Sequence, residues 1–531
     1  MKRNYFVCGL LALFGSLNMQ AAGDFTVNGI NYSVTDSAVV SVAADTTYKG
    51  AINIPASVAY DGIDYAVTAI ADKAFYYCTG VTSVVVPEGV TKLGYSAFRN
   101  CSGMTSITLP TTLEKIGSSA FYGCKSLAAI SIPAAVDSIK PYTFYGCEAL
   151  TSVNVPSNIV AIGGSAFYGC TELKSVVLPE GLTEIPSFAF FYCQKLESIN
   201  IPASVKQIDD YAFERCFLLT NITIPEGVVQ LGTSTFYLSG LTSVSLPASL
   251  QNITGSTFAG CLALQNFSVA DGNTVYSSPA GSNAIIEAIV DSKTQEVSYR
   301  LVAGCMNTVI PASVTEIGKY AFYDCIGLTS ISIPATVADV APYAFSGCLN
   351  LKNVDILEGV KSVGDYAFRN CWSLESVEIP STVTSISAGT FYGCSALKSV
   401  VLPSTIIDVD DYAFANCEAL TDFVCLAETC PKVYLDSFSG TPTENVVLRV
   451  PEAAVEAYQE NEVWGLFAIS GITDGNNVAP NKDAETAIDD LKGDAKIVSV
   501  YNLNGQQNAR MQRGINVVRM SDGTTRKVLM Q

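Results

Sequence analysis

The stretch M-T-S-I-T-L-P-T-T-L-E-K-I-G-S-S-A-F-Y-G-C (residues 104–124) decides the fold of this chain. Its closing motif, Ala-Phe-x-x-Cys, returns in related form about every 23 residues along most of the sequence. The marker phenylalanines are Phe75, Phe98, Phe121, Phe144, Phe167, Phe190, Phe213, Phe236 and Phe258, and, after a break, Phe322, Phe345, Phe368, Phe391 and Phe414. A fixed period of this length means stacked units, each of which buries its apolar face only against its neighbours. The sequence therefore predicts a solenoid, in which each repeat forms one rung.

The first half of the repeat predicts a strand. Met104, Ile107 and Leu109 follow the L-x-x-L-x-L pattern that is typical of leucine-rich repeats. Alternation over 106–109 predicts a short strand with its apolar side chains inward. Pro110 has no N–H to donate, so it is expected to end the strand.

The second half of the repeat is expected to return the chain. Leu113 and Ile116 should point inward along an extended stretch, and Phe121 and Cys124 should pack a short helical turn on the inside. The predicted fold is a mainly-β, right-handed leucine-rich-repeat coil. It has one short parallel strand per rung, short helical or extended return segments, and a small β domain at the C-terminus.

Composition excludes several kinds of function. The 531 residues include no histidine, which removes Ser-His-Asp and Cys-His catalysis and imidazole metal ligation. With 30 basic and 49 acidic residues the net charge is −19, so nucleic acid and anionic membranes are poor partners. The sequence predicts no enzyme: it offers no catalytic residue, no metal site and no cofactor.

The N-terminus has the pattern of a secretory signal peptide. Lys2 and Arg3 precede an apolar stretch over 5–17 and a small-residue region at 19–22. No later run of 18 apolar residues follows, so no transmembrane segment is expected. The mature chain is predicted to be secreted or held at the cell surface.

Most of the 17 cysteines occupy one position of the repeat. In an exported protein such cysteines could form disulfides or bind metal. Neighbouring rungs, however, lie about 4.8 Å apart, beyond the Cβ separation of about 3.8 Å that a disulfide prefers. Buried free thiols are therefore predicted. Cys425 and Cys430 lie outside the register, and a local disulfide between them stays open.

Breaks in the period suggest the organisation of the chain. The 266–308 interval contains turn residues and two strand-like runs, which predicts a hairpin within a variant rung. The expected segments are a signal peptide (1–22), an N-terminal cap and first rung (23–82), a first array (83–265), the hairpin-bearing rung (266–308), a second array (309–424), a C-terminal cap (425–471), a linker (472–492) and a small β domain (493–531).

The repeat also resembles a known family. The block S-V-x-[VIL]-P-x-x-V-x-x-I-G-x-x-A-F-x-x-C-x-x-L is similar to the 23-residue repeats of BspA-like bacterial surface proteins, with good matches at 83–104, 175–196 and 376–397. The resemblance covers roughly residues 24–470. It implies a secreted or cell-surface protein, in several cases an adhesin that binds host matrix or partner cells, and it implies no conserved active site.

The C-terminus carries a second resemblance. V-Y-N-L-N-G-Q (500–506) and G-I-N-V-V-R (514–519) are similar to elements of the type IX secretion sorting domain. Asn516 stands where that pattern usually has an aromatic residue, and the chain does not end in a basic residue. This resemblance implies delivery to the surface.

Two features of the repeat are candidate binding surfaces. Outward strand positions form polar ladders, in which Asp355 and Glu378 occupy adjacent rungs. This pair could hold a divalent cation, act as an acid and base, or simply be solvated like charges. The second feature is a row of tyrosines directly after the marker phenylalanine, with a further row two residues before it. The first row includes Tyr122, Tyr145, Tyr168, Tyr237, Tyr323 and Tyr392, and the second includes Tyr142, Tyr211, Tyr320, Tyr343, Tyr366 and Tyr412.

Tyrosine gives broad, rigid contact area, so these rows could bind protein or sugar, or could only cover the edge of the solenoid. The sequence thus favours a non-catalytic surface adhesion protein that binds a host or partner-cell macromolecule along the array. The alternative is a glycan-binding accessory protein that uses the tyrosine rows. An extracellular protein or glycan is the expected partner, and the sequence sets neither the ligand nor the oligomeric state.

Overall fold

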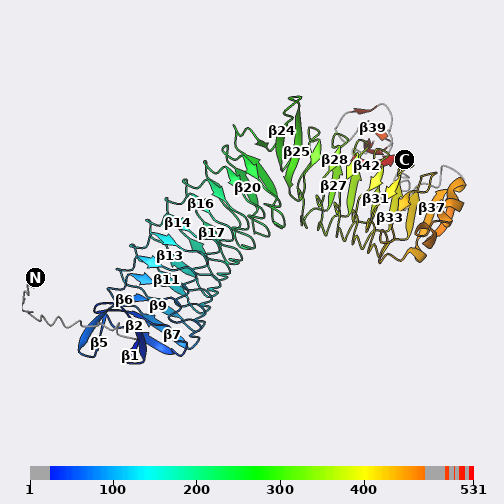
Figure 1. The fold of residues 1–531 in the computed structure, drawn as a ribbon. Coiled ribbons are helices and arrows are strands. Elements are labelled where there is room, and N and C mark those ends of the chain that lie inside the picture. Colours follow the sequence, from blue (N-terminus) through cyan, green and yellow to red (C-terminus); the bar gives the residue numbers. More distant parts are fainter. Residues whose placement is uncertain (1–23, 473–496, 502–506, 509–513, 521–524, 531) are drawn as a thin grey trace, which may run out of the picture.

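The computed structural model describes residues 24–472 and, beyond them, 497–501, 507–508, 514–520 and 525–530. Figure 1 shows a long, bent solenoid whose rungs follow one another along its axis. The predicted signal peptide (1–22) and, beyond Ile472, the predicted linker lie outside the described residues.

In most rungs one short strand pairs in parallel with that of the neighbouring rung, as the alternating apolar residues predict; the rung at 221–224 has no strand, and the ladder is divided into several sheets. In the register, each residue of β9 lies opposite the residue 23 positions earlier in β7. The strands of this ladder are β7 (Val81–Val85), β9 (Ser106–Thr108), β11 (Ala129–Ser131), β13 (Ser152–Asn154), β15 (Ser175–Val176), β17 (Ser198–Ile199), β20 (Ser243–Leu246), β22 (Asn266–Val269), β27 (Ser330–Ile333), β29 (Asn353–Ile356), β31 (Ser376–Glu378), β33 (Ser399–Leu402), β35 (Asp422–Cys425), β37 (Val447–Pro451) and β38 (Ala468–Ile472).

The return segment adds a second parallel ladder, where a single strand per rung was expected. Ile116 and its equivalents point inward here, as predicted. The strands are β8 (Lys92–Leu93), β10 (Lys115–Ile116), β12 (Ser138–Ile139), β14 (Ala161–Ile162), β16 (Glu184–Ile185), β18 (Gln207–Ile208), β19 (Gln230–Leu231), β21 (Asn252–Ile253), β26 (Glu316–Ile317), β28 (Asp339–Val340), β30 (Ser362–Val363), β32 (Ser385–Ile386), β34 (Asp408–Val409) and β36 (Lys432–Val433).

The segment around each marker phenylalanine is a series of turns, so the predicted helical turn is wrong. Phe121 N–H donates to the Thr143 carbonyl of the next rung at 2.9 Å, and Gly123 N–H donates to the Tyr145 carbonyl at 2.7 Å. A helix would direct these N–H groups along its own axis. Left-handed residues on either side of the phenylalanine, such as Ser119 (φ 57°) and Gly123 (φ 69°), turn them toward the neighbouring rung instead.

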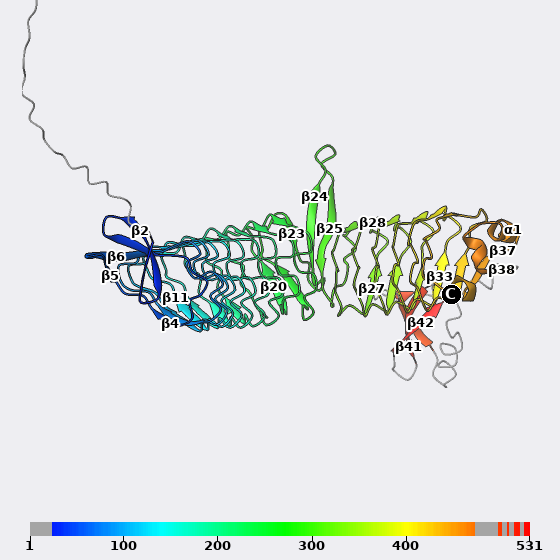
Figure 2. The same cartoon turned by 60° about the horizontal axis from the view of Figure 1, so that its bottom comes forward.

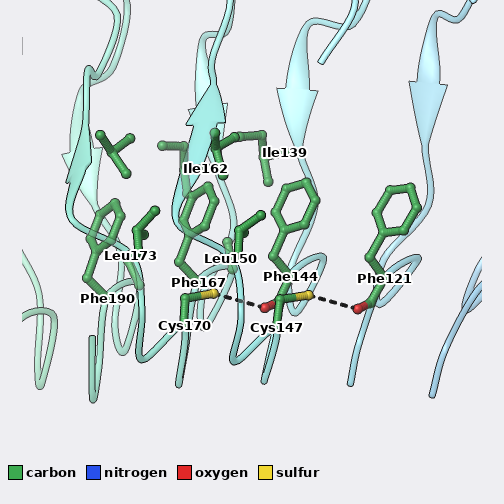
Figure 3. Packing of buried hydrophobic residues seen from close by; sticks show 14 of the residues in the cluster. Phe121, Ile139, Phe144, Cys147, Leu150, Ile162, Phe167, Cys170, Leu173 and Phe190 are labelled. Atoms are coloured by element: carbon green, nitrogen blue, oxygen red, sulfur yellow. Dashed lines mark hydrogen bonds between the residues drawn. The ribbon is translucent and has the colours of Figure 1, made fainter. Parts of the chain in front are cut away.

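The core is built from stacked phenylalanine rings. Phe75 to Phe258 form one stack and Phe322 to Phe438 another, with successive ring centroids 4.8–5.7 Å apart. Figure 3 shows part of the first stack with leucine and isoleucine side chains packed beside it. Each ring thus rests on its neighbours, which is why a rung needs the next one.

The repeat cysteines are free thiols, and all but Cys261 and Cys325 are buried. Beyond filling the core, as the sequence predicts, these thiols donate hydrogen bonds to the preceding rung. Cys147 Sγ donates to the Phe121 carbonyl of the preceding rung at 3.2 Å, and Cys170 Sγ to the Phe144 carbonyl at 3.2 Å (Figure 3). In the last rung the hydroxyl of Thr441 takes this role and donates to the Phe414 carbonyl at 2.6 Å. The position therefore requires a small donor as well as a small apolar group.

The 266–308 interval contains β23 (Tyr276–Ser277), β24 (Ala284–Val290) and β25 (Val297–Gly304). β24 and β25 form an antiparallel hairpin that projects from the solenoid, at the place where the two arrays meet at an angle (Figures 1 and 2). The base of the hairpin separates two apolar cores. Ile285 packs in the first core, whereas its neighbours Ala284 and Ile286 pack in the second.

Both ends of the solenoid are covered. The N-terminal cap consists of β1 (Phe25–Val27), β2 (Ile30–Asp36), β3 (Val39–Val42), β4 (Gly50–Asn53), β5 (Ser57–Tyr60) and β6 (Ile63–Ile70). The C-terminal cap adds η1 (Thr443–Asn445), η2 (Glu452–Ala454), α1 (Val455–Gln459) and η3 (Trp464–Leu466). Trp464 is fully buried there and its indole N–H donates to the Pro431 carbonyl at 3.0 Å.

Cys425 and Cys430, which were left open, are free thiols in this cap. Beyond it, β39 (Ile497–Tyr501), β40 (Gln507–Asn508), β41 (Gly514–Met520) and β42 (Thr525–Met530) form a separate antiparallel sheet in the order β40-β39-β41-β42.

Candidate functional site

Asp355 and Glu378 lie on the open strand face of the second array. Both side chains are exposed, on the adjacent strands β29 and β31. The register places Ser332 beside Asp355 and Val401 beside Glu378, so neither flank adds a carboxylate. Within 24–472 and the other described residues, no group of three or more His, Cys, Asp or Glu side chains is placed to hold a metal ion. The geometry is that of two solvated carboxylates.

Three tyrosines of the first row form a tight stack. The ring centroids of Tyr122 and Tyr145 are 4.5 Å apart, and those of Tyr145 and Tyr168 are 4.3 Å apart. Arg99 lies over Tyr122 at 4.0 Å, and Phe191 stacks on Tyr168 at 4.5 Å. Burial, with the neighbouring phenols, raises the pKa of Tyr145 to about 12. Because each face in this stack meets another flat group, the rings offer mainly their edges to a ligand.

Tyr237 and Tyr323 do not lie in neighbouring rungs of one array. They lie on either side of the 266–308 interval, where the two arrays meet. The Tyr237 hydroxyl donates to Asp324 Oδ2 at 2.5 Å, and the two tyrosine ring centroids are 6.4 Å apart. Burial raises the pKa of Tyr237 and that of Asp324. This contact joins the two arrays across an interval of 87 residues, so Tyr237 has a structural role at the junction.

The second tyrosine row is held at left-handed backbone positions. Tyr343 has φ 60° and Tyr366 has φ 55°, which is unusual for bulky residues. Tyr320, Tyr343 and Tyr366 stack with centroids 5.6 and 5.3 Å apart, and Lys319 lies 4.9 Å over Tyr320. The left-handed corner therefore presents one ring per rung along the side of the solenoid.

Gly389 interrupts this row. It stands 23 residues after Tyr366 and 23 before Tyr412, with φ 59°. A Cβ at Gly389 would lie 2.2 Å from Cε1 of Tyr366, so the Tyr366 ring occupies the space of the missing side chain. Beside this gap is a hollow of about 400 Å³, which we call the tyrosine hollow; it is lined by Tyr343, Tyr366, Arg369, Tyr392 and Tyr412.

The charges around the tyrosine hollow are few. The Arg369 guanidinium carbon is 5.6 Å from the Tyr392 ring centroid and 5.9 Å from that of Tyr366. At the edge, the Tyr412 hydroxyl donates to Asp436 Oδ2 at 3.4 Å, and the charge of Asp436 raises the pKa of Tyr412. Sequence reasoning named all four tyrosines of the lining in two separate rows, but it missed Arg369 and the hollow itself. The sequence feature that could have indicated the hollow is Gly389, which stands between Tyr366 and Tyr412 at the repeat position of the second tyrosine row.

The family model for "BspA type Leucine rich repeat region" matches residues 68–195, 160–284 and 295–421, in six copies. The chain belongs to the BspA-type leucine-rich repeat family. Its rungs are those of a leucine-rich-repeat binding protein, in a class whose members are generally non-catalytic. No curated protein matches the chain.

Several solved structures are similar to this family member. A leucine rich cell surface protein from Faecalibacterium prausnitzii is 26% identical, with a TM-score of 0.49 over 76% of this chain and 94% of its own. A leucine-rich repeat protein from Bacteroides ovatus is 25% identical, with a TM-score of 0.49 over 77% and 99%. The pneumococcal vaccine antigen PcpA is 17% identical, with a TM-score of 0.41 over 85% and 99%.

None of the helices within the described residues has the length and hydrophobicity that crossing a lipid bilayer requires.

Proposed function

We propose that this protein is a non-catalytic adhesion protein, secreted or held at the cell surface, that recognises a host or partner-cell macromolecule through its extended solenoid surface. The observation that supports the proposal best is the long strand face, on which exposed hydroxyl and amide side chains repeat from rung to rung. Ser152, Asn154, Ser175 and Ser198 are all exposed on consecutive strands. An open face of this kind suits broad contact with a large partner.

Delivery to the surface is part of the proposal. The N-terminal signal-peptide pattern supports export from the cytoplasm. The resemblance of 500–506 and 514–519 to the type IX sorting domain supports attachment at the outer surface, and the antiparallel pairing of β39, β41 and β42 gives this region a compact β structure. Family membership favours the same location.

A second candidate is a glycan-binding accessory protein that uses tyrosine. The stack of Tyr122, Tyr145 and Tyr168 speaks against the rows as a whole, because ring faces that stack on one another are not available to a sugar. The tyrosine hollow speaks for one local site, because the row is broken there.

The proposal is tested with the full mature chain on immobilised extracellular matrix proteins and on whole host cells. Ser152→Arg with Ser175→Arg places two large charged groups side by side on the strand face. Ala161→Arg, on the second ladder of the same rung, is the matched control. Saturable binding that the double variant weakens and the control retains is the expected result. Absence of saturable binding to both surfaces, or equal loss in the control, would contradict the proposal.

A further inference from the structure

The tyrosine hollow is the place where the aromatic side of the solenoid offers ring faces. In the second row, the stack of Tyr320, Tyr343 and Tyr366 stops at Gly389, which has no ring. In the first row, the residue one rung beyond Tyr392 is Ala415, which has no ring either. On the side of Gly389 and Ala415, the rings of Tyr366 and Tyr392 meet no further aromatic ring of the row, whereas along the Tyr122 stack a ligand would meet ring edges.

The lining is also electrostatically unlike the rest of the protein. The chain carries a net charge of −19, yet the hollow is lined by four phenols and one guanidinium, with no carboxylate among them. Asp436, which accepts from the Tyr412 hydroxyl, is the acidic group at its edge. Arg369 makes none of the ion pairs of the described residues, but its charge acts on the Asp324 carboxylate and favours the ionised form of that group. Its planar fork of N–H donors matches the geometry of a carboxylate.

We propose that the tyrosine hollow binds a carboxylate-bearing pyranose ring, as one residue of an acidic polysaccharide. The C–H face of the sugar packs on the ring of Tyr392 or Tyr366. The guanidinium of Arg369 donates to the carboxylate, and the phenol hydroxyls of Tyr343 and Tyr412 exchange hydrogen bonds with the ring hydroxyls. The hollow has a volume of about 400 Å³ and is open to solvent, which suits one residue of a polysaccharide that continues beyond it. This inference rests on the proposed binding function and names the ligand class of one local site.

The experiment measures binding of uronic-acid oligomers to the full chain by titration calorimetry. The probes are oligomers of galacturonate, of mannuronate and guluronate, and of glucuronate alternating with an amino sugar. Neutral galactose oligomers of the same length and a proline decamer are the comparison ligands. Arg369→Gln is expected to weaken uronate binding about ten- to a hundredfold, since one charge-assisted pair is lost. Tyr392→Ala is expected to weaken it at least as much.

Arg99→Gln is the matched control, because Arg99 occupies the same repeat position and also lies over a tyrosine, but does not line the tyrosine hollow. It should leave uronate binding unchanged. Equal affinity for neutral oligomers, or no effect of Arg369→Gln, overturns the carboxylate assignment. Preference for the proline decamer makes the hollow a peptide groove and overturns the proposal, as does failure of all the uronates to bind. If the Arg369→Gln variant still binds matrix proteins or cells, the broader adhesion function does not depend on the tyrosine hollow.

Discussion

Replacing Cys147 by serine, and separately by alanine, distinguishes two roles for the cysteines of the repeat. The sequence favours a small apolar filler, whereas the structure adds a hydrogen bond. Cys147 is fully buried, and its Sγ donates to the Phe121 carbonyl at 3.2 Å. The same carbonyl accepts the Cys124 N–H at 3.1 Å, so one oxygen joins two rungs.

The two substitutions should differ in cost. Alanine loses the bond, worth about 0.5–1.5 kcal/mol, and leaves a methyl-sized void that costs about 1 kcal/mol, roughly 2 kcal/mol together. Serine keeps a donor in the same place, as Thr441 does at 2.6 Å from the Phe414 carbonyl. Its cost should therefore stay below about 1 kcal/mol.

Native-state hydrogen exchange under reducing conditions is the suitable assay, because a long array need not unfold as one unit. The amides of Phe121 and Phe144, which bond to the following rung, report the local opening free energy. Thr441→Val is a reciprocal test: it keeps the volume but removes both the donor to the Phe414 carbonyl and the acceptor of the Cys417 N–H, so it should cost at least as much as Cys147→Ala. If serine costs as much as alanine or more, the thiol is only an apolar filler, because a hydroxyl buried without a partner is penalised.

Three further results are expected. Phe144→Ala removes a fully buried ring from the stack and should cost about 3–5 kcal/mol of local opening free energy by the same amide-exchange measurement, clearly more than Phe144→Leu; equal costs would mean that stacking contributes little. Burial raises the pKa of Cys394 from 9.0 to about 12, so the contribution of this thiol to folding stability should be constant below about pH 9 and should fall above it by about 1.4 kcal/mol per pH unit, because the unfolded chain ionises first. Cys394→Ser should make that slope shallower, and an unchanged slope would refute the assignment. Tyr237→Phe removes the donor to half-buried Asp324 and should destabilise the junction by about 1.5–3 kcal/mol, seen as faster amide exchange there and not at the caps; unchanged exchange would show that this bond does not couple the arrays.

Much of the fold could be predicted because every rung repeats the same information. The alternation around Ile107 and the period of Phe121 fix the strand ladder and the stacked core, and the mainly-β solenoid is confirmed. The helical turn was wrong because its backbone depends on left-handed residues. Gly123 gives a hint of this, but Ser119 and Tyr142, which have φ 57° and 60°, give none.

The candidate site was less predictable, because register says which residues are neighbours and not how their rings lie. Tyr122 and Tyr145 were correctly grouped in one row, but only coordinates show that their faces are covered. The partner of Tyr237 could not be found at all, since Asp324 lies beyond an insertion that breaks the period. Gly389 contributes to the hollow because it has no side chain where the neighbouring rungs have a tyrosine. A search for repeated residue types does not detect such an absence.

The hairpin between the arrays has a mechanical consequence. Ile285 belongs to one apolar core and Ala284 and Ile286 to the other, and the two cores have no residue in common. The solenoid therefore consists of two separately packed arrays in series, joined at the base of the β24–β25 hairpin. Under a force applied to the two ends of the solenoid, the junction at the hairpin should therefore open before either core loses its packing.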